Sequence, residues 1–146
     1  MSKSNERKVR RVGITFANVR LSNPHRPDLG SFERKFLIDT GAIYSVVPAN
    51  DLESLGVARL RREVFGLADG THQEYDVGEA FLELCSKCGT SPVVFAPEGV
   101  TPLVGVVTLE SFGLMVNPIT RELLPMRLFL AALGSPVRPS VGRAAA

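Results

Sequence analysis

The sequence predicts an all-β domain with one or two short helices, and three observations favour this class. Short apolar runs with many β-branched residues alternate with polar residues, as in half-buried strands. Gly, Pro, Asn and Asp separate these runs at short intervals and supply the turns. The chain has 146 residues, of which 45% are hydrophobic and 22% charged, a composition typical of one globular core.

The two ends of the chain differ from the body in composition. Residues 1–11 are rich in Lys and Arg, which predicts a basic flexible arm. Residues 131–146 are mainly small residues, Pro and Arg, which bury too little apolar surface to fold, so we expect a disordered tail. The predicted domain therefore covers residues 12–130.

Composition also bears on partners and compartment. The net charge is only +2, and no second basic cluster carries interleaved aromatic residues, so we expect no nucleic-acid partner. No apolar run approaches the roughly 20 residues of a membrane helix, so we expect no membrane partner. The charged start lacks the apolar stretch of a secretory signal, which favours a cytoplasmic location.

Five elements are expected in the first part of the chain. Alternating apolar residues predict a strand over residues 12–21, and Pro, Asn and Gly make residues 22–30 a loop. A second strand over residues 32–38 ends in an apolar run. Residues 44–47 are expected to form a short strand. A Pro before residues 49–56 and a Gly at their end favour a two-turn helix there.

Hairpins dominate the middle of the chain. The strands expected over residues 63–67 and 71–84 flank Ala-Asp-Gly at residues 68–70. Asp-Gly between extended runs is a strong hairpin signal. A second hairpin is expected to turn at residues 86–89 and to return through residues 92–95.

The last predicted elements are one helix and one hairpin. Residues 108–112 favour a short helix. The apolar runs at residues 114–117 and 122–124 favour a hairpin that turns across residues 118–120. No segment repeats with a period of roughly 20–50 residues, which argues against a solenoid or a propeller.

The motif that carries chemistry is Asp39-Thr40-Gly41, which follows an apolar strand end and precedes Ala42. Further along the chain, Leu103-Val104-Gly105 comes just before the expected short helix. This combination resembles the retropepsin-like aspartic proteases, a single-domain family whose active site is built from two copies of one chain. In that family, the segment similar to Leu103-Val104-Gly105 packs beneath the catalytic loop.

The resemblance implies a retropepsin-like acid-protease closed barrel with a dimeric active site. By likeness, Asp39 is the catalytic residue, and Thr40 hydrogen-bonds across the dimer to lock the two loops. Gly41 supplies a tight turn and a close backbone approach, which glycine permits at little cost. The implied activity is that of an aspartic endopeptidase that needs no cofactor and no metal.

The resemblance also implies how a substrate is held. The hairpin with Ala68, Asp69 and Gly70 at its tip resembles the family's flap, which closes over a bound peptide. Ala42, at the end of the motif, is expected beside the peptide as well. A protein or a peptide is therefore the expected substrate.

The chemistry requires a second chain. Aspartic proteolysis needs two carboxylates about 3 Å apart that share one proton, so that one activates water while the other polarises the peptide carbonyl. The pair titrates as a unit. The sequence holds one Asp-Thr-Gly and no Asp-Ser-Gly, so the second carboxylate has to come from another copy of the chain. This implies a symmetric homodimer and an inactive monomer.

Three other interpretations stay open. A retropepsin-like domain can be a catalytically idle dimerisation or peptide-binding module, because a fold does not prove turnover. Asp39-Thr40-Gly41 would also fit a simple turn in which Asp accepts backbone hydrogen bonds. Cys85 and Cys88 could supply half of a structural zinc site, which wants four ligands. Their hairpin position favours ordinary hairpin residues instead.

Overall fold

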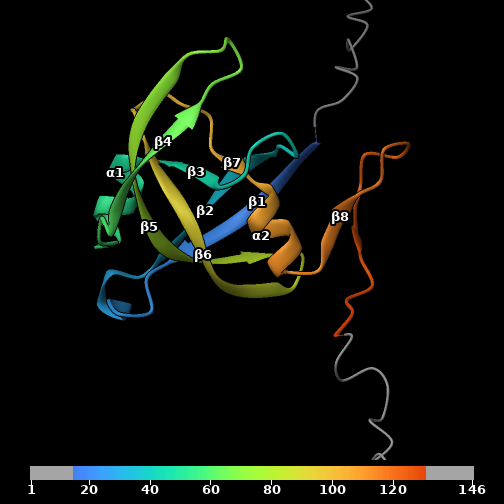
Figure 1. Ribbon diagram of the computed structural model, residues 1–146. Helices are drawn as coiled ribbons and strands as arrows, with labels where there is room; N and C mark the ends of the chain where they lie inside the picture. The colour runs from blue at the N-terminus through green and yellow to red at the C-terminus, as the bar shows by residue number, and fades with distance from the viewer. Residues whose placement is uncertain (1–14, 131–146) are drawn as a thin grey trace, which may run out of the picture.

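The computed structural model describes residues 15–130, in which strands predominate (Figure 1). The expected arm, residues 12–14 and the expected tail lie outside the described residues. The all-β class is confirmed for the part of the chain that is described, and no helix in that part is long and apolar enough to cross a membrane. The elements are β1 (Thr15–Ser22), η1 (Pro27–Leu29), β2 (Ser31–Ile38), β3 (Ser45–Pro48), α1 (Ala49–Ser54), β4 (Arg61–Gly66), β5 (His72–Leu84), β6 (Lys87–Ala96), β7 (Leu103–Val104), α2 (Val106–Ser111), β8 (Leu114–Val116) and β9 (Leu123–Pro125).

One predicted turn is wrong, although the predicted strands and helices are present with shifted bounds. The second hairpin was expected to turn at residues 86–89, but it turns at Cys85 and Ser86, whose φ values are 50° and 61°. Positive φ at both central residues is what a two-residue type I′ turn requires. Gly89 lies within β6, where an added Cβ would come within 3.3 Å of the Phe112 ring. This glycine therefore serves packing and not the turn.

One seven-stranded sheet includes β2 and β3, the two strands that flank Asp39 in the sequence. Its order is β1-β2-β7-β3-β6-β5-β4, and β1 also pairs with β5 through residues 20–22. The pairings thus lead from β1 through β2, β7, β3, β6 and β5 back to β1. The two-residue strand β7 was not expected as a strand, yet it joins β2 to β3 by pairing parallel to the first and antiparallel to the second.

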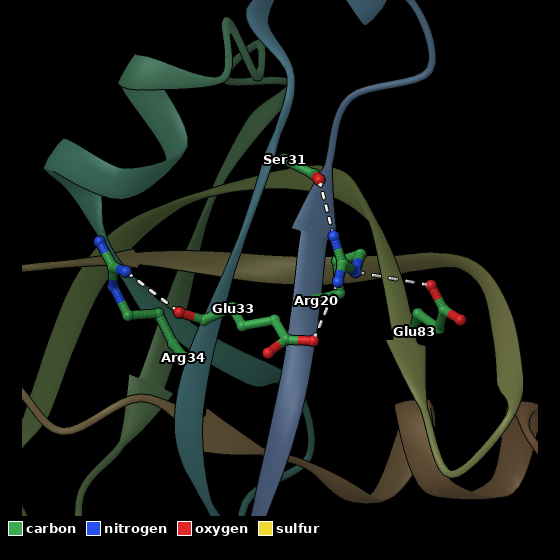
Figure 2. A network of polar contacts seen from close by, with 5 residues as sticks. All are labelled: Arg20, Ser31, Glu33, Arg34 and Glu83. Carbon is green, nitrogen blue, oxygen red and sulfur yellow. Dashed lines mark hydrogen bonds and ion pairs between the residues drawn. The ribbon is translucent and has the colours of Figure 1, made fainter.

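An ion-pair network crosses the seam where β1 lies between β2 and β5 (Figure 2). The guanidinium of Arg20 on β1 lies 3.1 Å from the Glu33 carboxylate on β2 and 4.0 Å from the Glu83 carboxylate on β5. It also donates to the Ser31 hydroxyl at 3.3 Å. Glu33 and Glu83 are the direct register partners of Arg20 in the two pairings, so the network joins both neighbours of β1 at one level.

The core is formed by the inward faces of the large sheet. Buried and exposed residues alternate along the second half of β1 and along much of β5, as expected where one face of a strand packs against the core. The two helices add Leu52 of α1 and Leu109 of α2 to this core. The largest fully buried apolar side chains are Phe36, Leu21, Leu52, Leu55, Leu82 and Leu84.

The β8–β9 hairpin stands beside α2, on the side away from α1 (Figure 1). After β9 the chain stays hydrogen-bonded to the start of this hairpin: the Met126 N–H donates to the Gly113 carbonyl, just before β8, at 2.8 Å. The side chains of Leu128, Phe129 and Leu130 are 63%, 78% and 70% exposed. The last described residues thus present an uncovered apolar segment.

Candidate active site

Asp39 is the first residue after β2, and backbone hydrogen bonds hold it in place. Its N–H donates to the Val104 carbonyl of β7 at 3.0 Å. Its carboxylate oxygen Oδ1 accepts the Gly41 N–H at 2.9 Å, and its carbonyl accepts the Ala42 N–H at 3.2 Å. Asp and Gly are favoured in such turns, because the Asp side chain caps nearby N–H groups. The result is a tight loop that leaves the carboxylate half-buried at the end of a strand.

Residues 104–107 hold the loop from behind. The Val106 N–H donates to the Ala42 carbonyl at 2.8 Å, and the Val107 N–H donates to the Ile43 carbonyl at 3.0 Å. Gly105 approaches the loop so closely that an added Cβ would lie 2.5 Å from the carbonyl carbon and oxygen of Tyr44. Glycine alone permits such an approach without displacing the backbone.

The hairpin of β4 and β5 ends in a tip at residues 67–71 that projects beyond the sheet (Figure 1). The Leu67 N–H donates to the Thr71 carbonyl at 2.7 Å, and Gly70 has a φ of 84°. The Asp69 carboxylate accepts the Thr71 hydroxyl at 2.6 Å and the Thr71 N–H at 2.9 Å. These two bonds, the hydroxyl bond above all, lower the pKa of Asp69. Asp69 is therefore ionised at neutral pH and stabilises the tip.

A groove of about 620 Å³ lies against both the loop and the hairpin. This volume is within the range of small-ligand sites, roughly 300–1,000 Å³. Asp39 is the only carboxylate among the described residues that line the groove. The remaining wall is largely apolar and includes Val46, Val64, Leu67, Val94, Val100 and Leu103.

Three aromatic side chains in the groove join the loop to the hairpin. The ring of Tyr44 meets the ring of Phe65 edge to face, with centroids 6.0 Å apart, and the Phe65 and Tyr75 centroids are 6.2 Å apart. Arg61 donates to the Tyr44 hydroxyl at 3.4 Å. Such pairs prefer edge-on or offset contact and add stability beyond the area they bury. These contacts join β4 to Tyr44, at the end of the loop that begins with Asp39.

The residues singled out from the sequence divide into two groups in the structure. Asp39, Gly41, Ala42 and Ala68 line the same groove, although Ala68 comes from the hairpin tip and the others from the loop. The exposed residues Thr40, Asp69 and Gly70 are not among the lining residues. The structure thus brings together the motif and one side of the hairpin tip.

Three buried hydroxyl groups near the loop were missed by the sequence analysis. Ser45 of β3, Ser91 of β6 and Thr108 of α2 are 0%, 1% and 0% exposed. Thr108 hydrogen-bonds to both serine hydroxyls. In the sequence, Ser45 and Thr108 are each flanked by apolar residues, and this was the available signal. Ser91 stands between Thr90 and Pro92 and gives no such signal.

The two cysteines lie at the other hairpin and are both exposed and unbridged. Cys85 is in the turn, and Cys88 is opposite Glu83 in the β5–β6 pairing. Within residues 15–130, no three His, Cys, Asp or Glu side chains gather as metal ligands would.

Comparison with known proteins adds no assignment. No family model matches the chain, and no curated protein matches it. A half-buried carboxylate beside an apolar groove can accept a proton from a water molecule, and a second carboxylate can supply the matching acid.

Proposed function

We propose that this protein is an aspartic endopeptidase that works as a homodimer. The observation that carries the proposal is the position of Asp39 as the single carboxylate, among the described residues, that lines an apolar groove beneath a projecting hairpin. The Asp39-Thr40-Gly41 motif and the close packing of Gly105 against its loop add support. The retropepsin-like family is the one whose pattern these residues resemble.

The proposed fold is the closed acid-protease barrel. The pairing of β1 with both β2 and β5 supports it, because it closes a ring of six strands, β1, β2, β7, β3, β6 and β5, while β4 pairs with β5 outside that ring. The hairpin tip formed by residues 67–71 is the proposed flap. In the dimer, two flaps would cover one substrate-binding channel.

The proposed reaction uses paired Asp39 carboxylates from two copies of the chain. One is ionised and takes a proton from water, while the protonated one donates to the carbonyl oxygen of the peptide bond. The oxygen of the water bonds to the carbonyl carbon and forms a tetrahedral diol. The first carboxylate then gives its new proton to the nitrogen and the second takes a proton back from a diol hydroxyl, as the carbon–nitrogen bond breaks. Each carboxylate thus acts once as base and once as acid.

The proposed substrate is an extended peptide with apolar side chains. Apart from Asp39, the described lining residues carry no charge at neutral pH, so a charged side chain buried in the groove would lack a partner. The aromatic rings of Tyr44, Phe65 and Tyr75 offer apolar contact area. Peptides with large apolar residues on both sides of the cleaved bond should therefore be cut best.

The test is cleavage of a diverse peptide pool from acidic to neutral pH by the wild type, Asp39→Asn and a control. Asp28→Asn is a matched control, because it makes the same chemical change on an exposed carboxylate paired with Arg26 in η1. We expect cleavage by the wild type and by Asp28→Asn, but not by Asp39→Asn. The oligomeric state of all three proteins is measured alongside by sedimentation.

Two outcomes would contradict the proposal. Equal cleavage by the wild type and Asp39→Asn would assign the activity to another group or to a contaminant. If no protein cuts although all are dimers, the chain is better described as a peptide-binding or dimerisation module. Such a module should keep its peptide affinity after Asp39→Asn.

A further inference from the structure

A chain of buried hydroxyl groups runs through the core behind the Asp39 loop. The Thr108 oxygen Oγ1 lies 2.5 Å from Ser45 Oγ and 2.6 Å from Ser91 Oγ. Buried hydroxyl groups are unfavourable unless they are hydrogen-bonded, and apolar residues of similar size would pack there without that requirement. Three polar groups in one place therefore point to a role besides packing.

The row of hydroxyl groups ends at the peptide group to which Asp39 is hydrogen-bonded. The Ser45 hydroxyl accepts the Gly105 N–H at 3.1 Å. The carbonyl of that same peptide group belongs to Val104, and it accepts the Asp39 N–H at 3.0 Å. Because a peptide group is planar and rigid, a rotation that weakens one of these bonds also weakens the other. Ser45 thus controls the orientation of the group to which Asp39 is bonded.

The side chains of Ser91 and Thr108 connect to Asp39 through Ser45. Neither is among the residues that line the groove, so neither contacts a peptide bound there. Thr108 fixes the Ser45 hydroxyl from α2, and Ser91 fixes Thr108 from β6. The network thereby couples β3, β6 and α2 to one backbone bond of the catalytic loop.

We propose that Ser45, Ser91 and Thr108 are positioning residues that align Asp39 for catalysis. The proposal rests on the proposed function, because alignment matters only if two Asp39 carboxylates must share a proton. Misplacement of a reacting group by about 1 Å can cost about 100-fold in rate. Loss of the network should therefore lower turnover more than it lowers substrate binding.

The test compares Thr108→Val, Thr108→Ser and Val19→Ala in the full chain. Thr108→Val keeps the side-chain shape and removes the hydroxyl, whereas Thr108→Ser keeps the hydroxyl. Val19→Ala removes volume from β1 at a fully buried position and serves as a control for lost stability. Each variant is assayed as the dimer for kcat, KM and the pH dependence of kcat on one apolar peptide.

We expect Thr108→Val to lower kcat by about 10- to 100-fold while KM stays within about twofold. Its two apparent pKa values in the kcat profile should also move, because they depend on how closely the two carboxylates approach. Thr108→Ser should restore both properties. Val19→Ala should lower the melting temperature and leave kcat and the pH profile unchanged. A Thr108→Val enzyme that matches Val19→Ala in both readouts would overturn the proposal.

Amide hydrogen exchange separates this proposal from the proposed function. If the wild type cuts no peptide, the proposed function fails, but the exchange rates of the Asp39 and Gly105 amides still report on the network. Thr108→Val should speed these two amides beyond what its loss of global stability explains. Unchanged rates would refute the positioning role by themselves. If Thr108→Val does not fold, Ser91→Ala removes the far end of the network and carries the same test.

Discussion

Replacing Gly105 by alanine tests how tightly the loop of Asp39 is held. An alanine Cβ at this position would lie 2.5 Å from the Tyr44 carbonyl carbon and oxygen and 2.9 Å from the Ile43 oxygen. All three atoms belong to the backbone, so no side chain can rotate away. To reach an ordinary contact, the Cβ has to retreat by about 0.9 Å, from 2.5 Å to 3.4 Å.

That movement would break the hydrogen bonds between the two segments. The Val106 N–H to Ala42 bond is 2.8 Å long, the Val107 N–H to Ile43 bond is 3.0 Å and the Gly105 N–H to Ser45 bond is 3.1 Å. Each is worth about 1 kcal/mol net, so losing all three destabilises the fold by about 3 kcal/mol. Domains of this size have about 5–15 kcal/mol of stability, so Gly105→Ala should still fold.

The assay is urea unfolding followed by circular dichroism, with Gly66→Ala as the control. A Cβ at Gly66 would meet nothing closer than His72 at 3.7 Å, so that variant should stay within about 0.5 kcal/mol of the wild type. If the free energy of unfolding of Gly105→Ala also lies within about 1 kcal/mol of the wild-type value, the close approach of Gly105 does not hold the loop. Equal slopes of the unfolding transitions would show that the free energies are comparable.

Two further predictions concern the hairpin tip and the seam. Hydrogen bonds from Thr71 lower the pKa of Asp69 in the folded protein. Their contribution to the stability of the fold is therefore complete above the unfolded-state pKa of Asp69, and it is lost as the pH falls through the folded-state pKa. The NMR signal of the Thr71 amide should therefore titrate with a midpoint below pH 3.8. In the Asp69→Asn control, this titration should disappear. A Thr71 signal that does not change with pH in the wild type would contradict the prediction. Arg20→Met removes two exposed ion pairs and should cost less than about 1 kcal/mol. That loss should vanish in about 1 M salt, and a loss that persists would mean that Arg20 stabilises by packing.

The features that the sequence predicts well are those set by neighbouring residues. The turn at Asp69-Gly70 is one, because Gly70 takes a φ of 84° and the Asp69 side chain bonds two residues ahead. The turn at Asp39-Thr40-Gly41 is another, since the bonds made within it span two or three residues. Local turn chemistry decides both, and the sequence displays it directly.

The second hairpin shows how burial overrides that local chemistry. Gly89 is the residue that most favours a turn in its region, yet Cys85 and Ser86 turn with positive φ. The register that results keeps Leu82 and Leu84 buried on one strand. A shift of one residue would turn buried side chains of this hairpin toward solvent, so the register decides where the turn falls. Gly89 then pairs with Leu82 and leaves room for the Phe112 ring.

The resemblance implied that Leu103-Val104-Gly105 packs beneath the loop of Asp39, but the hydrogen bonds that support Asp39 could not be predicted from the residues, because they depend on pairings between distant segments. Nothing near Val104 in the sequence says that its carbonyl will accept the Asp39 N–H, 65 positions earlier in the chain. The same holds for Thr108, whose hydroxyl meets partners on β3 and β6. In each case the sequence shows only whether the residue is apolar or polar. The pairing of β7 with both β2 and β3 is what brings Val104 next to Asp39.

Substitutions of a residue bonded within its own turn and of a residue bonded to distant segments should have different effects. A change at Asp39 should remove the proposed activity and spare the fold, because its side chain is half-buried and bonds within its own turn. A change at Gly105 should weaken both, because this glycine touches the Tyr44 backbone and also donates to Ser45. If the proposed turnover falls in Gly105→Ala by the same factor as the population of the proposed dimer, the loop retains its alignment and the loss is one of stability alone. A larger fall in turnover would mean that the peptide group between Val104 and Gly105 aligns the carboxylate.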